Sequence, residues 1–255
     1  MEIAWAQDED SFQRVQTLQT PWFVDFADLN GDQIKDMVGV YGNSNAEIKV
    51  FYGNANGTFQ LANTYIGGGE YYKVFLQNIN SDNIPDIVAQ SDISGLMLLS
   101  SPAGYGAATL PALPPYNSGT TLFSDFNNDG QTDIFVKNQV FIIVNNSYNS
   151  TASIPGNGDA EAVNYNNDSF MDILMVNSGS GTVDFYAGNG NGTFDSPVSK
   201  TITAQAAISY DLNTDGFIDI ILKGYNGEIT ILYNDASFSF SQSTTIQLGI
   251  IFSQH

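Results

Sequence analysis

The 255-residue chain has no cysteine and a single histidine, which is the last residue, His255. The lack of cysteine excludes a disulfide framework, a thiolate metal site and a thiol nucleophile. The Ser/His and Cys/His pairs of common hydrolases are missing as well. No apolar run approaches the roughly 18 residues of a membrane span, and the opening stretch MEIAWAQDEDSF lacks the basic flank and apolar centre of a signal peptide. We therefore expect a protein without catalytic residues and without direct membrane insertion.

Basic residues are also scarce. Seven Lys and Arg residues stand against 27 Asp and Glu residues, and the formal net charge is −20. Repulsion between this charge and phosphate groups argues against nucleic acids and anionic membrane surfaces as partners. The charge favours bound cations instead, because 13 of the 27 acidic residues fall in five short loops of one pattern.

The five loops repeat one arrangement of oxygen-bearing side chains. They read DLNGDQIKD from Asp28, NINSDNIPD from Asn78, DFNNDGQTD from Asp125, NYNNDSFMD from Asn164 and DLNTDGFID from Asp211. Asp or Asn occupies loop positions 1, 3, 5 and 9, and position 7 offers its backbone carbonyl. Such a set of oxygens in a tight turn suits a hard cation, so we expect up to five bound calcium ions.

The candidate metal ligands are the residues at positions 1, 3, 5, 7 and 9 of each loop. They are Asp28, Asn30, Asp32, Ile34 and Asp36; Asn78, Asn80, Asp82, Ile84 and Asp86; Asp125, Asn127, Asp129, Gln131 and Asp133; Asn164, Asn166, Asp168, Phe170 and Asp172; and Asp211, Asn213, Asp215, Phe217 and Asp219. Only Gly130 and Gly216 supply the glycine that a sharp turn at position 6 favours. We expect loops 125–133 and 211–219 to bind calcium best, and loops 78–86 and 164–172, with Asn at position 1, to bind more weakly. For any single loop the alternative is a turn capped by its own side chains, without metal.

The loops also define a repeat. Their starts lie 50, 47, 39 and 47 residues apart, about the length of a four-stranded propeller blade. Strand-like runs such as WFVDF (22–26) and MVGVY (37–41) flank each loop, and a third strand recurs, as in EIKVFYGNANGTF (47–59). Helical periodicity is absent. The pattern predicts a single all-β domain over residues 1–255, a propeller of four-stranded antiparallel blades.

The two ends of the chain bear on the number of blades. Residues 2–18 align with the third and fourth strands of a repeat, and residues 244–255 resemble residues 201–211, which lead into the fifth loop. The simplest interpretation is six blades, five of them complete and one composite blade built from both termini, with no open sheet edge. The alternative is a fragment of a seven-bladed ring.

These residues resemble the FG-GAP or VCBS repeats of integrin-α-like β-propellers, whose blades carry a D-x-[DN]-x-[DN]-G-x-x-D loop between their first and second strands. The resemblance covers residues 2–252. It implies calcium in the loops at one end of the propeller, chiefly as a structural ion, and a partner bound by other loops. Members of the family serve in adhesion, as lectins and as modules of larger surface proteins.

We therefore expect a calcium-stabilised, non-enzymatic binding or adhesion module, extracellular or on the cell surface. Its protein or glycan ligand would bind on the face opposite the calcium loops, where Tyr72 and Tyr116 are the candidate contact residues. Five Asn-x-Ser/Thr triplets are compatible with secretion. The alternatives are a lectin and, as an enzyme, a propeller glycosidase that would use a carboxylate pair such as Glu70 and Glu161.

Overall fold

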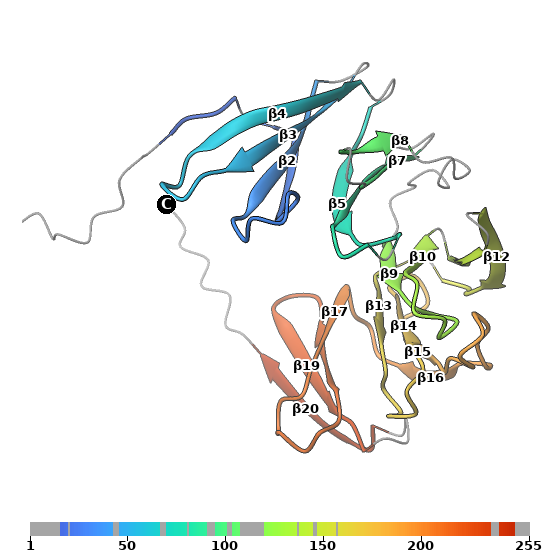
Figure 1. Cartoon of the computed structure of the whole chain (residues 1–255). Helices are drawn as coiled ribbons and strands as arrows, with labels where there is room; N and C mark the ends of the chain where they lie inside the picture. The colour runs from blue at the N-terminus through green and yellow to red at the C-terminus, as the bar shows by residue number, and fades with distance from the viewer. Residues whose placement is uncertain are drawn as a thin grey trace, which may run out of the picture.

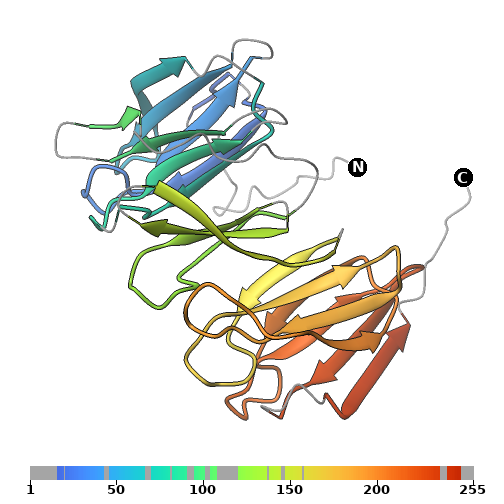
Figure 2. The ribbon, with the colours of Figure 1, turned by 90° about the vertical axis from the view of Figure 1, so that its right-hand side faces the viewer.

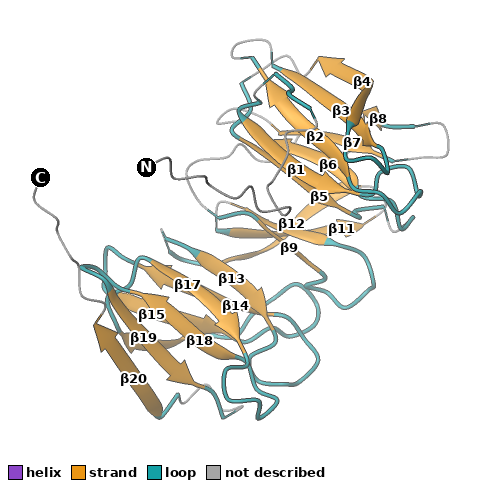
Figure 3. Cartoon of the chain, turned by 90° about the vertical axis from the view of Figure 1, so that its left-hand side faces the viewer, coloured by secondary structure: helices purple, strands orange, loops and turns teal. Residues whose placement is uncertain are grey.

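The computed structural model describes residues 16–19, 21–42, 46–66, 70–80, 82–90, 95–100, 104–107, 120–136, 138–144, 147–156, 158–235 and 240–247. Over these ranges the chain forms β-strands and no helix (Figure 3). Accordingly, the described part of the chain contains no helix long and apolar enough to cross a membrane.

The strands form five four-stranded antiparallel sheets, each ordered as the chain runs. The first sheet holds β1 (Phe23–Ala27), β2 (Asp36–Tyr41), β3 (Glu47–Gly53) and β4 (Phe59–Ile66); the second holds β5 (Lys73–Gln77), β6 (Asp86–Gln90), β7 (Gly95–Leu99) and β8 (Gly106–Ala107); the third holds β9 (Leu122–Ser124), β10 (Asp133–Val136), β11 (Gln139–Val144) and β12 (Ser147–Ser153); the fourth holds β13 (Ala160–Val163), β14 (Asp172–Asn177), β15 (Thr182–Tyr186) and β16 (Val198–Thr201); and the fifth holds β17 (Ala206–Tyr210), β18 (Asp219–Lys223), β19 (Glu228–Tyr233) and β20 (Gln242–Gln247).

The sheets follow one another in chain order around an open arc (Figures 1 and 2). Their first strands lie innermost, and contacts join β1 to β5, β9 to β13 and β13 to β17. An apolar core fills each of the four spaces between successive sheets; Phe135 of the third sheet and Met175 of the fourth, for example, share one core. This face-to-face stacking of four-stranded meanders is an all-β propeller arrangement.

The second strand of each sheet explains why the sequence folds this way. Every residue of β2, β6, β10 and β14 is buried. The near-continuous apolar runs after the loops therefore serve strands that are covered on both faces, as the sequence predicted. In contrast, all of β20 is exposed, and its sequence QSTTIQ is largely polar. The core thus runs through the middle of each sheet and leaves the outermost strand in solvent.

The five complete repeats of the sequence correspond to the five sheets, and each loop joins the first strand of its sheet to the second. The composite sixth blade is built in the sequence mainly from residues 2–15 and 248–255, which lie outside the described residues. The number of blades stays a prediction on that account. The all-β class and the four-stranded antiparallel sheets are confirmed.

Two glycines allow the loops to lie in close backbone contact with the ends of the third strands. A Cβ atom on Gly53 would collide with the backbone carbonyl of Lys35, and one on Gly188 would collide with that of Met171. Lys35 and Met171 both occupy position 8 of their loops, so the same close approach recurs in the first and fourth sheets. Glycine is required here because backbone meets backbone, and neither chain can yield without shifting a strand.

We predict that Gly188→Ala lowers the free energy of unfolding by roughly 1–3 kcal/mol, because the added methyl forces the loop away from the strand end. Gly106→Ala is the matched control: no atom lies within 4 Å of the added Cβ, and its effect should stay within about 0.5 kcal/mol. Urea unfolding of both variants measures the difference. Equal losses would contradict the proposed close approach.

Candidate metal-binding loops

All five loops connect a first strand to a second strand, so the antiparallel meander places them at the same end of every sheet. Their backbone bends in the same way. At position 6, φ is positive in every loop: Gln33 67°, Asn83 67°, Gly130 83°, Ser169 80° and Gly216 91°. The expected left-handed turn at position 6 is therefore present even where glycine is missing.

Position 4 is left-handed as well, a feature that the sequence did not reveal. Gly31, Asn128, Asn167 and Thr214 have φ values of 79°, 59°, 61° and 61°. Asn tolerates this region better than most residues, which accounts for its recurrence here.

Positions 3, 5 and 7 form an identical hydrogen-bonded chain in all five loops. In the first loop the amide of Asp32 donates to Asn30 Oδ1 at 2.9 Å, and the amide of Ile34 donates to Asp32 Oδ1 at 2.8 Å. The Asn30 side-chain amide also donates to Asp32 Oδ2 at 3.1 Å. The corresponding bonds of the other loops have the same partners. These are side-chain-capped turns.

The position-1 carboxylate caps the left-handed residue at position 6. Asp28 Oδ2 accepts the amide of Gln33 at 2.8 Å, and Asp125 and Asp211 accept the amides of Gly130 and Gly216 at 2.7 and 3.0 Å. In the fourth loop, Asn164 offers only one oxygen, which accepts the amide of Asp168 at 3.2 Å. The three loops with aspartate at position 1 therefore hold their turn with one more charge-assisted bond.

The position-9 aspartates have a different role, which sequence reasoning missed. Each is fully buried, with 0% exposure. In the fourth loop, Asp172 Oδ2 accepts the amide of Tyr165 at 2.7 Å, and Oδ1 accepts the amide of Gly188 at 2.9 Å. The other four connect the same two places, the amide of loop position 2 and an amide at the end of the third strand. This carboxylate ties the loop to the body of its sheet.

Burial gives the inner carboxylates, at position 9, a higher pKa than the outer carboxylate of Asp28 at position 1. It raises the pKa of Asp133 and of Asp172 to about 6, against the lowering effect of their backbone hydrogen bonds. It also raises the pKa of Asp36 and Asp86. For the outer Asp28, slight burial acts upward, but the amides of Gln33, Gly31 and Asn30 outweigh it and lower the pKa. Asp28 therefore presents an ionised carboxylate at the outer end of its loop.

The second loop differs from the others. The Ser100 hydroxyl lies 2.7 Å from Asp82 Oδ2, 2.9 Å from Asp86 Oδ1 and 3.3 Å from the Ile84 carbonyl, so it touches candidate ligands at positions 5, 9 and 7. At position 1, Asn78 Oδ1 is buried without a hydrogen-bond partner. This loop thus combines an orphan acceptor, which a cation would satisfy, with a hydroxyl that competes for the remaining oxygens.

The donor set of the loops fits calcium in its chemistry. All candidate ligands are carboxylate, amide or carbonyl oxygens, and an oxygen that accepts one hydrogen bond keeps a lone pair for a cation. Over the described ranges, no three Asp, Glu, His or Cys side chains converge closely enough to form a metal cluster on their own. The predicted sites accordingly depend on the Asn side chains and the position-7 carbonyls as much as on the aspartates.

The remaining candidates lie elsewhere. Tyr72 is partly buried, and its hydroxyl donates to Glu70 Oε2 at 2.9 Å. Tyr116 falls outside the described residues. Glu161 of β13 accepts a hydrogen bond from Ser209 of β17, and the Tyr165 hydroxyl lies 3.0 Å from the same serine oxygen. Burial raises the pKa of Glu161. Glu161 thus takes part in a polar bridge between the fourth and fifth sheets.

A hollow of about 220 Å³ lies at the seam between the first and second loops. Its lining is mixed, with two tyrosine rings, Tyr52 and Tyr105, beside the polar Asn30 and Ser100. The Tyr105 hydroxyl donates to the Pro85 carbonyl of its own repeat at 2.7 Å and lies 3.5 Å from the Leu29 carbonyl of the first loop. The hollow is smaller than the roughly 300–1,000 Å³ of drug-sized sites, so it suits about one ring of a small polar ligand.

No protein-family model matches the chain, and no curated protein shows significant sequence similarity to it. Solved structures are similar in fold. A protein from Lactobacillus plantarum superposes with a TM-score of 0.55 at 12% identity, over 90% of this chain and 70% of that one. A chain from the crystal structure of BBS1N in complex with ARL6DN gives 0.54 at 12% identity, over 91% and 70%. Both support the propeller arrangement, and at this identity they concern the fold alone.

An Agrocybe aegerita lectin that recognises non-reducing terminal N-acetylglucosamine is also similar, at 18% identity over 87% of this chain and 79% of that one. Its TM-score of 0.43 is too low to support an argument about this chain.

We predict that the position-9 aspartate matters to the calcium-free fold and the position-5 aspartate does not. Asp172→Ala leaves the amides of Tyr165 and Gly188 without their acceptor, and each buried unpaired amide costs roughly 1–3 kcal/mol. Asp168→Ala is the control in the same loop, because Asp168 is exposed. Urea unfolding in excess EDTA compares the two. A larger loss for Asp168→Ala would refute the tie between loop and sheet.

Proposed function

We propose that this protein is a calcium-stabilised, non-enzymatic binding module that acts outside the cell or on its surface. The observation that supports this proposal is the fivefold repetition of one loop geometry at one end of the stacked sheets. The same left-handed turn at position 6 and the same chain of amides that donate to the side-chain oxygens of positions 3 and 5 recur in all five loops, although the residues between them differ. The geometry of the candidate ligands repeats while the residues between them vary, and this supports one common ligand for all five loops.

The residues that would hold each ion are the side chains at positions 1, 3, 5 and 9 and the carbonyl at position 7. A bound calcium ion supplies two positive charges where the loop concentrates two or three carboxylates. It thereby removes their mutual repulsion, and it binds the folded state in preference to the unfolded one. Its role here is structural: it fixes the loop ends of the sheets and takes no part in bond making.

The absence of an enzymatic activity is part of the proposal. The usual histidine and cysteine nucleophile systems are missing from the sequence. Of the two glutamates considered for a glycosidase, Glu70 accepts the Tyr72 hydroxyl, and Glu161 is engaged by Ser209 between two sheets. Both carboxylates have evident structural partners, and we propose no carboxylate pair for glycoside hydrolysis.

A partner protein or glycan would bind at the opposite end of the sheets. There the connections between second and third strands, and between sheets, vary in length where the calcium loops repeat. Variable loops on a rigid scaffold are the usual seat of recognition. Tyr72 lies just before β5 at this end and is the described candidate contact, with its ring oriented by the bond to Glu70.

We predict that millimolar calcium raises the melting temperature by several degrees over protein in EDTA, because the ions bind only the folded loops. Asp129→Ala or Asp215→Ala should lower the calcium stoichiometry and this shift more than Asp82→Ala or Asp168→Ala. The reason is that the third and fifth loops keep three aspartates and the turn glycine. Calorimetric titration and thermal melts measure both quantities. A melting temperature that is the same in calcium and in EDTA excludes the calcium proposal.

The hollow beside Tyr52 lies at the loop end of the sheets, and it favours a neutral glycan there as a second candidate ligand, distinct from the partner proposed at the opposite end. A sugar ring has apolar faces that pack on aromatic rings, and its hydroxyls match the amide of Asn30 and the hydroxyl of Ser100. The surrounding acidic loops would exclude anionic sugars, so a neutral saccharide is the class to test.

We predict that Tyr52→Leu abolishes neutral-glycan binding on a glycan array, since it removes the aromatic ring and keeps an apolar side chain. Tyr225→Leu is the control, because Tyr225 is an exposed tyrosine in the turn between β18 and β19 of the fifth sheet and does not line the hollow. Tyr52→Leu must keep the calcium-dependent melting shift for the comparison to count. An array without signal for the unmodified protein would rule out the glycan and leave the calcium proposal untouched.

A further inference from the structure

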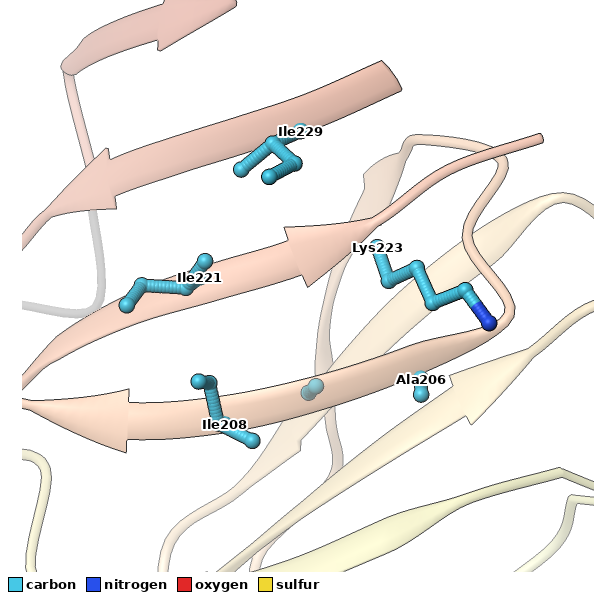
Figure 4. A pocket seen from close by; sticks show the side chains of 6 residues that line it. Ala206, Ile208, Ile221, Lys223 and Ile229 are labelled. Atoms are coloured by element: carbon cyan, nitrogen blue, oxygen red, sulfur yellow. The ribbon is translucent and has the colours of Figure 1, made fainter. Parts of the chain in front are cut away.

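The free face of the fifth sheet is hollowed, but this hollow offers no oxygen ligands to a cation. A cavity of about 300 Å³ opens there between three strands. Figure 4 shows the side chains around it, which are Ala206 and Ile208 from β17, Ile221 and Lys223 from β18, and Ile229 from β19. The lining is aliphatic apart from one ammonium group, which is itself a cation. The hollow between the first and second loops is more polar, and Ser100 belongs to its lining.

Ser100 occupies a position that recurs in every sheet. Its backbone amide, near the end of the third strand, donates to Oδ1 of the position-9 aspartate at 2.6 Å. The equivalent residues of the other sheets make the same bond, and they are Gly53, Ile143, Gly188 and Asn234. The first three have no side-chain oxygen, and Asn234 donates its side-chain amide to the carbonyls of Tyr165 and Ile218. Loops with the same backbone geometry therefore meet different side chains at this position.

The Ser100 hydroxyl lies against three candidate ligands of the second loop at once. Its Oγ is 2.7 Å from Asp82 Oδ2, 2.9 Å from Asp86 Oδ1 and 3.3 Å from the Ile84 carbonyl oxygen. Oxygens that bind one calcium ion at about 2.3–2.6 Å lie roughly 2.7–3.7 Å from their neighbours in the coordination shell. The three measured distances fall in this range, so Oγ lies where a sixth ligand oxygen would lie.

Without a cation, this group of oxygens is short of hydrogen-bond donors. A hydroxyl has one hydrogen to donate, yet two carboxylate oxygens lie within 3 Å of Ser100 Oγ. The side-chain amide of Asn80 is shared between Asp82 Oδ2 at 3.1 Å, Ser100 Oγ at 3.3 Å and the Ser100 carbonyl at 3.0 Å. At position 1, Asn78 Oδ1 is buried and accepts no hydrogen bond from the described residues. One cation in the loop would satisfy these oxygens together.

We propose that the Ser100 hydroxyl is a sixth protein ligand for calcium in the second loop, and that it makes this loop a tighter site than the fourth. This rests on the calcium-binding function proposed above. Both loops have Asn at positions 1 and 3 and Asp at positions 5 and 9. With the position-7 carbonyl they supply five ligands, and calcium takes about six to eight. The fourth loop takes its sixth oxygen from water, whereas the second has a hydroxyl already held in place.

The fourth loop has no room for a serine at the equivalent position. A Cβ atom on Gly188 would lie 2.1 Å from the Met171 carbonyl oxygen. The close approach of strand and loop that fixes the fourth loop therefore excludes the ligand that the second loop has. Two loops with the same ligand types in the sequence thus differ in a ligand that only the third strand provides.

Calcium titration of the ¹⁵N-labelled full chain, followed by NMR, tests the proposal because each loop reports its own occupancy. The amides of Ile84 and Phe170 are the reporters, since each donates to the position-5 aspartate of its loop. The Kd of the second loop should be at least about fivefold lower than that of the fourth. Ser100→Ala should raise the Kd of the second loop at least about tenfold, since even an outer-sphere partner is worth that much, and leave the fourth loop unchanged. Ser100→Thr keeps the hydroxyl and should bind as the unmodified protein does.

The comparison of the two loops in the unmodified protein needs no variant, so it decides the matter even if Ser100→Ala does not fold. A second loop that binds no more tightly than the fourth would overturn the proposal. So would a Kd in Ser100→Ala that is unchanged or lower, because the hydroxyl would then be a bystander or an obstacle to the cation. In these cases calcium shifts in loops 125–133 and 211–219 would leave the proposed function standing. The absence of shifts in all five loops would overturn both.

Discussion

The buried aspartate at loop position 9 is the constraint on which each sheet depends. Its carboxylate lies where the first strand has ended, the second begins and the third arrives, and it accepts amides from both sides. A carboxylate without solvent is costly unless it is hydrogen-bonded, so the strand ends must come together around it. The register of the second strand against the third follows from this anchor. The same hydrogen bonds attach the loop to the sheet at a fixed point.

This anchor divides the carboxylates of a loop into two electrostatic classes. The outer ones are partly buried at position 1 and exposed at position 5, and the pKa of Asp28 and of Asp82 is lowered. The inner Asp133 and Asp172 have a pKa raised to about 6 by burial. A raised pKa means that the folded state binds this proton more tightly than the unfolded state. The resulting stabilisation is full below the ordinary pKa of aspartate and is lost as the pH rises through about 6. A cation beside the inner carboxylate would offset that loss at neutral pH.

Much of the fold is legible in the sequence because it rests on local patterns. Apolar runs after each loop predict buried strands, and the loop spacing predicts the four-stranded repeat. The left-handed turn at position 6 follows from the loop pattern even at Gln33 and Ser169, whose φ values are 67° and 80°. A residue other than glycine at position 6 makes the turn more strained, but the turn keeps the same left-handed shape. The ligands named for calcium stay a prediction, although their oxygens lie in the expected order.

What could not be predicted from sequence depends on contacts between distant residues. Nothing local marks Asp172 as the acceptor for Gly188, or Ser100 as the hydroxyl that reaches Asp82 and Asp86. Position 9 resembles a metal ligand by spacing, and its second role appears only when the third strand is in place. The tyrosine-lined hollow between the first two loops likewise arises where two repeats meet, so no single repeat encodes it.

The arrangement separates the two tasks that we propose for the protein. The candidate cation sites lie at one end of the sheets, and the variable connections lie at the other, with buried second strands running between them. Those strands are covered on both faces, and their close packing makes them rigid. They therefore hold the two ends of each sheet at a fixed distance and orientation. Among the described residues, only the end faces of the arc lack a neighbouring sheet.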